Sequence, residues 1–389
     1  MSAHRRRFGL AASAYAFAVT MVGTTLPTPL YVLYRARFGF SELMITVIFA
    51  TYAGGVIAAL LLFGRLSDEL GRRRVLLGGL ACSALSAAAF LLAQGLGLLL
   101  AGRVLSGLSA GIFTGTATAT LVDFAAPERR GRATLVATMA NMGGLGCGPL
   151  LAGILAQTAG AQLRLTFWVD LALLIPATIA ILAMAEPVKT PDRPRLRPQA
   201  LAIPSQLRAT FIRASLAGFA GFAVLGLFTA VSPAFLGQEL KVSSHATVGL
   251  VVFAVFAAST AGQLMLERIP TRVALPAGCG GLIAGMALLA LGLATTSLAL
   301  LVSGGVIAGL GQGLSFRAGL SELNAQAEPD QRAEVASSFF VVAYVAISLP
   351  VIGEGVLAQA ATLKTAGLVF SAVVAALSAL VLVLLRSEP

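Results

Sequence analysis

The chain has 389 residues, of which 58% are hydrophobic and 11% charged, and its mean hydropathy is +0.91. Soluble domains carry about 25% charged residues, so this chain has too few to cover a surface that faces water. The composition excludes a soluble globular protein. It predicts a polytopic membrane protein, because the length has room for twelve spans of ~20 apolar residues.

The net charge of +11 would suit nucleic-acid binding, but the positions of the charges indicate membrane topology instead. With twelve spans and both termini in the cytoplasm, most Lys and Arg residues lie in cytoplasmic loops, as is typical of membrane proteins. The basic residues that fall in outer loops are Arg35, Arg37, Arg164, Lys241 and Lys364. We therefore expect an inner (plasma) membrane protein that contacts the lipid bilayer and binds no nucleic acid.

The N-terminal apolar run follows Arg5–Arg7 and continues to about Leu30, which is too long for a cleaved signal peptide. We read it as the first span. The further apolar segments of the first half fall at about residues 43–63, 75–93, 98–122, 133–156 and 165–185. Cys82, Cys147 and Cys279 lie in separate apolar segments, far from either histidine, so neither a disulfide nor a metal site is expected.

Residues 186–208 differ in composition from the rest of the chain. Prolines alternate here with charged residues, which predicts an extended linker. The chain then repeats features of the first half in the same order: Gly102–Gly107 parallels Gly304–Gly309, and Pro149 parallels Pro350. The repeat predicts an all-α membrane protein with two six-helix bundles, 1–185 and 209–389, joined by a cytoplasmic linker. Paired halves around a midplane site are typical of alternating-access carriers.

A charged stretch, GRLSDELGRRRVLL, lies between the second and third apolar segments, at residues 64–77. It resembles motif A of the major facilitator superfamily of secondary transporters. The matching positions are Gly64, Asp68, Gly71, Arg72 and Arg73.

The resemblance implies a conformational latch. Asp68 would meet the positive N-terminal end of helix eleven and stabilise an outward-open state, and Arg72 would pair with Asp123 at the end of the fourth helix. A loop that only sets membrane topology is the alternative. It would need the arginines, but not two glycines and an aspartate at fixed spacing.

Two further stretches resemble motifs of the same superfamily. Arg103, Gly107 and Gly111 match motif B. An arginine within a span is costly and indicates a function, here to organise a kinked first helix or to act on a nearby acid. The alternative is that Arg103 extends along the helix to the outer surface.

The fifth span resembles motif C of the drug–proton antiporters. The matching positions are Gly144, Gly148, Pro149 and Gly153, and Ala152 stands in place of a glycine of the motif. Small residues four apart allow close helix approach, and proline bends a helix. The resemblance implies that this face packs on the eighth span and seals the outer side. An ordinary glycine packing seam is the alternative.

Proton coupling requires an ionisable group inside the membrane, and Asp170 and Glu354 are the two acids placed there. Burial favours the neutral form of a carboxyl group, which suits a group that binds and releases protons. The alternative is that each acid caps a helix or pairs near the surface. The first span lacks the acid that several drug exporters of this family place there. We expect the proton as coupling ion and no other cofactor.

Polar side chains in the middle of spans are candidates for contacts with substrate. They are Thr24, Tyr52, Asn141, Gln312 and Tyr344. A few polar groups in an apolar cavity suit a moderately hydrophobic ligand. Each could instead satisfy a hydrogen bond between helices.

The sequence thus predicts a monomeric, proton-coupled exporter of a small amphiphilic compound. A proton-linked sugar or metabolite transporter, or a receptor that binds without transporting, are the alternatives. We expect no enzyme, because no nucleophile–base pair, HExxH motif or phosphate-binding loop occurs.

Overall fold

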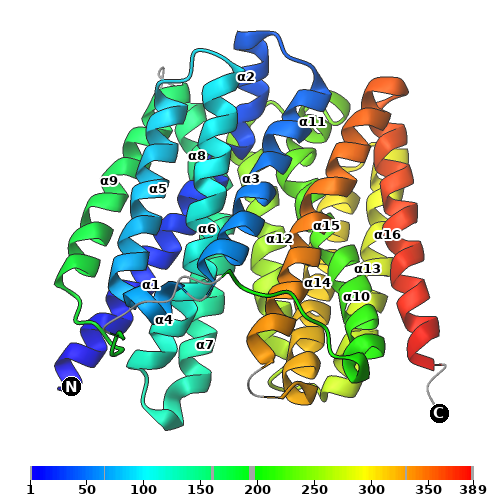
Figure 1. Cartoon of the computed structure of the whole chain (residues 1–389). Helices are drawn as coiled ribbons and strands as arrows, with labels where there is room; N and C mark the ends of the chain where they lie inside the picture. The colour runs from blue at the N-terminus through cyan, green and yellow to red at the C-terminus, as the bar shows by residue number, and fades with distance from the viewer. Residues whose placement is uncertain (1, 65, 159–161, 192–197, 329–330, 387–389) are drawn as a thin grey trace. The chain divides into compact units, whose positions relative to one another are not determined.

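The computed structural model describes residues 2–64, 66–158, 162–191, 198–328 and 331–386. Within these ranges all regular structure is helical, and twelve segments are long and apolar enough to cross a membrane (Figure 1). The predicted all-α class with twelve spans is therefore confirmed. The chain divides into two compact units.

The first unit comprises the chain up to Tyr34 and Thr51–Ala200. Within it, α1 packs against α6, α8 and α9, and α5 packs against α6 and α9. In chain order the elements that contribute to it are α1 (Ala3–Thr25), η1 (Thr28–Leu30), α2 (Tyr31–Phe38), α3 (Glu42–Phe63), α4 (Leu66–Leu70), α5 (Arg72–Leu91), α6 (Leu96–Phe124), η2 (Pro127–Arg129), α7 (Arg130–Thr138), η3 (Met139–Gly143), α8 (Gly144–Thr158) and α9 (Gln162–Ala183).

The second unit comprises Arg35–Ala50 and the chain from Leu201 onward. Here α10 packs against α14, α15 and α16, and α13 packs against α14 and α16. Besides parts of α2 and α3, its elements are η4 (Ser205–Leu207), α10 (Arg208–Ala230), α11 (Ser232–Ala234), η5 (Phe235–Glu239), α12 (His245–Met265), α13 (Thr271–Ala294), α14 (Leu298–Gln326), α15 (Arg332–Ala360) and α16 (Leu363–Arg386).

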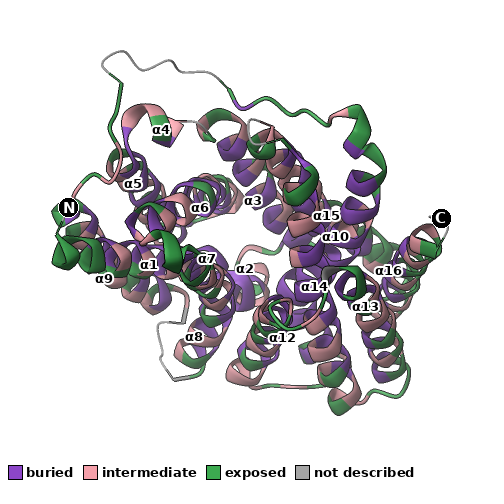
Figure 2. Cartoon of the chain, turned by 90° about the horizontal axis from the view of Figure 1, so that it is seen from below, coloured by how far each residue is buried: buried purple, intermediate pink, exposed green. Residues whose placement is uncertain are grey.

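The two units share one packing pattern. The first long helix of each, α1 or α10, contacts the fourth, fifth and sixth spans of its own half, and the third span contacts the fourth and sixth. The fourth spans, α6 and α14, have 29 residues each. In the second unit, α10 is buried over most of its surface while α16 has an exposed face (Figure 2). The repeat read from the sequence therefore corresponds to a repeated bundle.

The first long helix of each half ends in an irregular segment at a proline. In the first half, Thr24 and Thr25 donate side-chain hydrogen bonds to carbonyls one turn earlier, and the 3₁₀ segment η1 contains Pro29. In the second half, Pro233 precedes the π-helical segment η5. Proline removes a backbone donor, so the regular helix ends at these positions.

The two units differ from the predicted halves at residues 35–50. The sequence predicts these residues in the first bundle, but their contacts place them in the second unit. The side chains of Glu42 and Thr46 contact η5 and α15 respectively, which explains the grouping. These contacts link segments about 200 or more positions apart in the chain, so local sequence patterns give no sign of them.

Candidate functional site

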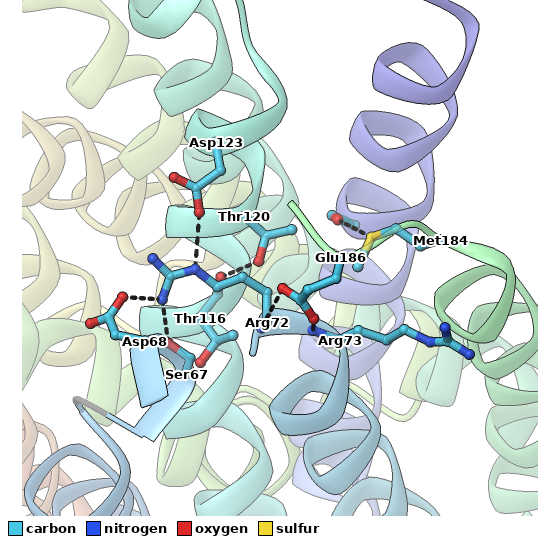
Figure 3. Close-up of polar contacts among 10 residues, drawn as sticks. Ser67, Asp68, Arg72, Arg73, Thr116, Thr120, Asp123, Met184 and Glu186 are labelled. Atoms are coloured by element: carbon cyan, nitrogen blue, oxygen red, sulfur yellow. Dashed lines mark hydrogen bonds and ion pairs between the residues drawn. The ribbon is translucent and has the colours of Figure 1, made fainter. Parts of the chain in front are cut away.

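Arg72, the first residue of α5, is the centre of the motif A cluster (Figure 3). Its Nε donates to Asp123 Oδ2 at 2.9 Å, and its Nη1 donates to Asp68 Oδ1 at 2.7 Å and to Ser67 Oγ at 2.5 Å. The guanidinium therefore joins α4, α5 and the end of α6. The pairing of Arg72 with Asp123 that the resemblance implied is present in the structure.

Asp68 and Arg72 differ in how far they are buried. The whole Arg72 residue is 8% exposed, whereas the side chain of Asp68 is 62% exposed and lies one helical turn earlier. Asp68 is therefore accessible for a further contact while it remains paired with Arg72. Its contact with the N-terminal end of the eleventh span stays a prediction.

Glu186, just after α9, completes this cluster. The sequence motifs did not identify it as a site residue. Its Oε1 accepts from the backbone N–H of Arg72 at 2.9 Å, and its Oε2 accepts from that of Arg73 at 3.0 Å (Figure 3). The first N–H groups of a helix have no partner within it, and a carboxylate there also interacts favourably with the helix dipole. Glu186 therefore caps α5. Arg73 contributes its backbone, and its side chain forms no ion pair within the described residues.

The two glycines of motif A both lie against the segment that follows the sixth span. Gly71 has φ of +93°, and a Cβ atom there would lie 2.7 Å from Glu186 Oε2. A Cβ atom on Gly64 would lie 3.2 Å from Cβ of Gln199, whose backbone N–H donates to the Leu61 carbonyl at 2.7 Å. A linker residue packs against each of the two glycines, so a side chain at either position would crowd the linker. This explains why glycine is needed at both positions.

Arg103 of motif B is 1% exposed. Its Nη1 donates to the Thr24 carbonyl at 2.7 Å, and its guanidinium carbon lies 4.7 Å from the centre of the Tyr52 ring. The structure thus brings together three predicted site residues, from α1, α3 and α6. The side chain does not extend to the surface. It binds the first helix just before that helix breaks, as expected for a residue that organises the kink.

The glycines of motif B form a close seam between α3 and α6. A Cβ atom on Gly107 would lie 2.9 Å from the Cα atom of Gly55, and one on Gly111 would lie 2.6 Å from Cβ of Ala59. Such small residues allow two helix backbones to approach closely. This seam holds Tyr52 beside Arg103.

Motif C lies on α8, where Pro149 and Gly153 are buried. Cβ atoms on Gly144 and Gly148 would collide with α1, at 2.6 Å from Met21 Cβ and 2.5 Å from the Val22 carbonyl oxygen. These two glycines therefore pack on the first span. The implied packing of the motif C face on the eighth span stays a prediction, and at Gly144 and Gly148 α1 fills the space that their missing side chains leave.

Both candidate acids are deeply buried. Asp170 on α9 and Glu354 on α15 are each 2% exposed. Oδ1 of Asp170 and both carboxyl oxygens of Glu354 have no hydrogen-bond partner among the described residues. Among the residues that the structure describes, neither side chain caps a helix or pairs near the surface, as the alternative required. Of these residues, each unit thus holds one buried acid inside a candidate span.

The five candidate cavity residues separate into different environments. Gln312 is fully buried and accepts a hydrogen bond from Ser259 Oγ at 2.5 Å, which joins α12 and α14. The hydroxyl of Thr24 donates to its own helix, at the Thr20 carbonyl. For Gln312, the structure shows the hydrogen bond between helices that was the alternative; the hydroxyl of Thr24 is bound within α1.

Tyr344 and Asn141 occupy the two other environments. Tyr344 is 8% exposed and meets the Phe222 ring edge-on at 6.4 Å. Asn141 is partly exposed and lies in the π-helical segment η3. Such π-helical bulges frequently occur at functional sites, so Asn141 remains a candidate for contact with substrate.

Two bundles with the same packing order, with twelve candidate spans in the described part of the chain, have the architecture typical of secondary transporters. A sequence model of the Major Facilitator Superfamily matches residues 8–351, and the chain belongs to this family.

Among curated relatives, a triacylglyceride transporter of Mycolicibacterium hassiacum is 30% identical over 160 residues, 39% of this chain and 28% of that protein. The multidrug resistance protein MdtL of Escherichia coli is 31% identical over 132 residues, 34% of this chain and 32% of that protein. The chain thus spans about 30% of the length of the curated relatives it matches.

Solved structures of the same fold cover nearly the whole chain. An inward-facing bacterial homologue of the human lysosomal transporter Spinster has a TM-score of 0.78 and 17% identity over 99% of this chain and 98% of that one. The human organic anion transporter MFSD10 has a TM-score of 0.69 and 18% identity over 99% of this chain and 100% of that one. At these identities the likeness concerns the fold.

Proposed function

We propose that this transporter exports a small amphiphilic compound in exchange for protons. It would lie in the inner membrane as a monomer with both termini in the cytoplasm, and the proton would be its coupling ion. The observation that carries the proposal is the pair of buried acids: among the described residues, Oδ1 of Asp170 and both carboxyl oxygens of Glu354 have no hydrogen-bond partner. A charged carboxylate buried without a partner costs several kcal/mol, so these side chains are stable here when they hold a proton.

Coupling follows if the same groups meet water in another conformation. An acid that is protonated when buried and loses its proton when exposed links proton movement to the conformational change. The latch around Arg72 would bias that equilibrium, because Asp68 contributes a negative charge at the exposed edge of the cluster. A contact of Asp68 with a helix N-terminus is worth typically 0.3–1 kcal/mol, enough to shift a balanced equilibrium without locking it.

The amphiphilic substrate class is supported by the named relatives and by the composition of the spans. One relative is named for a lipid and another for multidrug resistance. The partly exposed polar side chain of Asn141 lies in a mostly apolar stretch of the fifth span, which suits a ligand with one polar region. A sugar would need many more hydrogen-bonding groups.

A transport assay in everted vesicles tests the proposal. The compound used in this assay would be chosen by a thermal-shift screen of drugs and metabolites, as the one that stabilises the purified protein most. We expect its uptake to require an acidic lumen and to stop when the pH gradient collapses. Uptake that continues without the gradient would reject coupling, and a sugar as the best stabiliser would favour a sugar transporter. Binding without movement in either direction would indicate a receptor.

A further inference from the structure

Residues 35–50, here called the α2–α3 segment, are held in the second unit by contacts at two levels. At the first level, the Glu42 carboxylate accepts from Gln238 Nε2 at 2.6 Å and forms an ion pair with Arg35. Gln238 belongs to the π-helical segment η5. One carboxylate therefore fixes both the turn before α3 and the contact with η5.

At the second level, one helical turn further along α3, the side chain of Thr46 lies against the backbone of α15. A Cβ atom on Gly355 would lie 2.9 Å from Thr46 Cγ2 and 3.2 Å from Thr46 Cβ. The Thr46 side chain can approach the α15 backbone this closely because Gly355 has no side chain. Thr46 itself is 3% exposed, so the contact is a packed one.

Glu354 directly precedes the glycine that Thr46 contacts. Its side chain is closed off from solvent, and neither carboxyl oxygen has a hydrogen-bond partner in the part of the chain that the structure describes. The same stretch of α15 packs on α10, where a Cβ atom on Gly226 would lie 2.8 Å from Val351 Cγ2. Glu354 therefore lies on a stretch of α15 that is packed by α10 and by the α2–α3 segment.

We infer that the α2–α3 segment is a lid over a proton-binding site at Glu354. With the lid in place, Glu354 holds its proton, because a charged carboxylate without a partner is costly in this environment. Loss of the proton favours the conformation in which the lid has left α15 and water reaches the carboxylate. The inference rests on the proposed proton coupling and assigns Glu354 as the acid whose access to water this segment controls.

Charged groups on the neighbouring elements do not offer Glu354 a partner in this conformation. Glu42 on α3 is bound by Arg35 and Gln238, and Lys364 at the start of α16 donates to the Ala294 carbonyl at 3.1 Å. Of the remaining charged residues on the elements packed on α15, Arg317 lies inside α14 and donates to the Gln263 carbonyl at 2.6 Å, and Lys241 follows η5. The others lie in the first or last two turns of their helices: Arg37, Arg208, Arg213, Glu322 and Arg386. A neutral Glu354 is therefore compatible with all of its surroundings.

Cysteine labelling of the purified full chain in detergent tests the lid. Thr46→Cys reports on the covered face, and Ala36→Cys, on the exposed part of the same segment, corrects for the pH dependence of thiol reactivity. Both are made in a chain with Cys82, Cys147 and Cys279 replaced by alanine. The maleimide labelling rate of Thr46→Cys relative to Ala36→Cys should rise with pH, by up to about tenfold per pH unit, the limit for one proton.

Glu354→Gln is the decisive partner variant, because glutamine is neutral at every pH. In that background the relative labelling rate should stay low and independent of pH. A wild-type rate that does not change with pH, or a rise that persists in Glu354→Gln, would overturn the inference. The readout needs no substrate and no membrane gradient, so a failure of the transport proposal appears separately, as uncoupled uptake in vesicles.

A second pair of variants tests the lid without touching the acid. Gly355→Ala places a methyl group against Thr46 and should raise labelling of Thr46→Cys at every pH. Gly353→Ala, on the same helix with no atom within 4 Å of its Cβ position, should leave labelling unchanged. Equal labelling in the two variants would contradict the contact on which the inference depends.

Discussion

The carboxylate of Asp170 on α9 lies against Gly23 on α1, with both oxygens 2.8 Å from the position that a Cβ atom on Gly23 would take. The next residue, Thr24, binds Arg103 through its carbonyl oxygen. One stretch of the first helix thus contacts an acid and a base, immediately before the helix breaks. We propose that Asp170 on the sixth span takes the place of the acid that the first span lacks.

Gly23→Ala should displace the Asp170 carboxylate and impair transport. The methyl group cannot fit without movement of α9, and overpacking of this kind costs about 1–3 kcal/mol. Thermal unfolding and transport measured on the same preparation would check this. Gly78→Ala is the matched control, because nothing lies within 4 Å of its Cβ position, and it should unfold and transport like the unmodified protein. Equal behaviour of the two variants would contradict the packing of Asp170.

Arg72→Lys should destabilise the protein, whereas Arg73→Lys should have little effect. Lysine cannot reproduce the planar set of donors that reaches Asp123, Asp68 and Ser67 together. Hydrogen bonds to charged groups contribute about 1.5–3 kcal/mol each, so loss of one should lower the unfolding temperature clearly. A larger loss for Arg73→Lys would show that its side chain, not only its backbone, carries part of the cluster.

Glu186→Ala should destabilise the start of α5 by about 0.5–2 kcal/mol, the usual range for loss of a helix cap. The backbone N–H groups of Arg72 and Arg73 would lose their acceptor. Hydrogen exchange at these two amides should rise, while exchange in the middle of α5 should not. Unchanged protection of both amides would mean that Glu186 does not cap this helix.

Asp68→Asn should slow turnover without loss of folding or insertion. Its side chain is mostly exposed, and an exposed ion pair contributes little to stability, about 0–1 kcal/mol. A slower transport rate in a normally folded protein would therefore come from the conformational equilibrium. Transport at the rate of the unmodified protein would show that Asp68 does not act as a conformational latch.

The motifs predicted the fold and part of the site because they report local requirements. An arginine inside a span and a charged loop of fixed spacing are visible in the sequence, and Arg103 and Arg72 are both central in the structure. Glu186 was missed because it lies 114 positions from Arg72, and its only signal is an acid directly after a span.

The sequence did not predict which side chains on different helices contact one another. Gln312 was predicted to contact substrate because a polar residue in mid-span suits either role, and only the position of Ser259 decides for the helix contact. Gly144 and Gly148 were matched to a motif, but the helix that fills their seam is set by tertiary packing. The grouping of residues 35–50 with the second unit has the same origin.

Proton movement driven by a substrate gradient is the direct signature of exchange between substrate and protons. Purified protein would be reconstituted in liposomes with a pH-sensitive dye inside, and the best thermal-shift ligand would be added outside as a concentration gradient. We predict that the ligand moves protons in the opposite direction, and that Asp170→Asn combined with Glu354→Gln moves none. Ligand uptake without any change in internal pH would contradict the account.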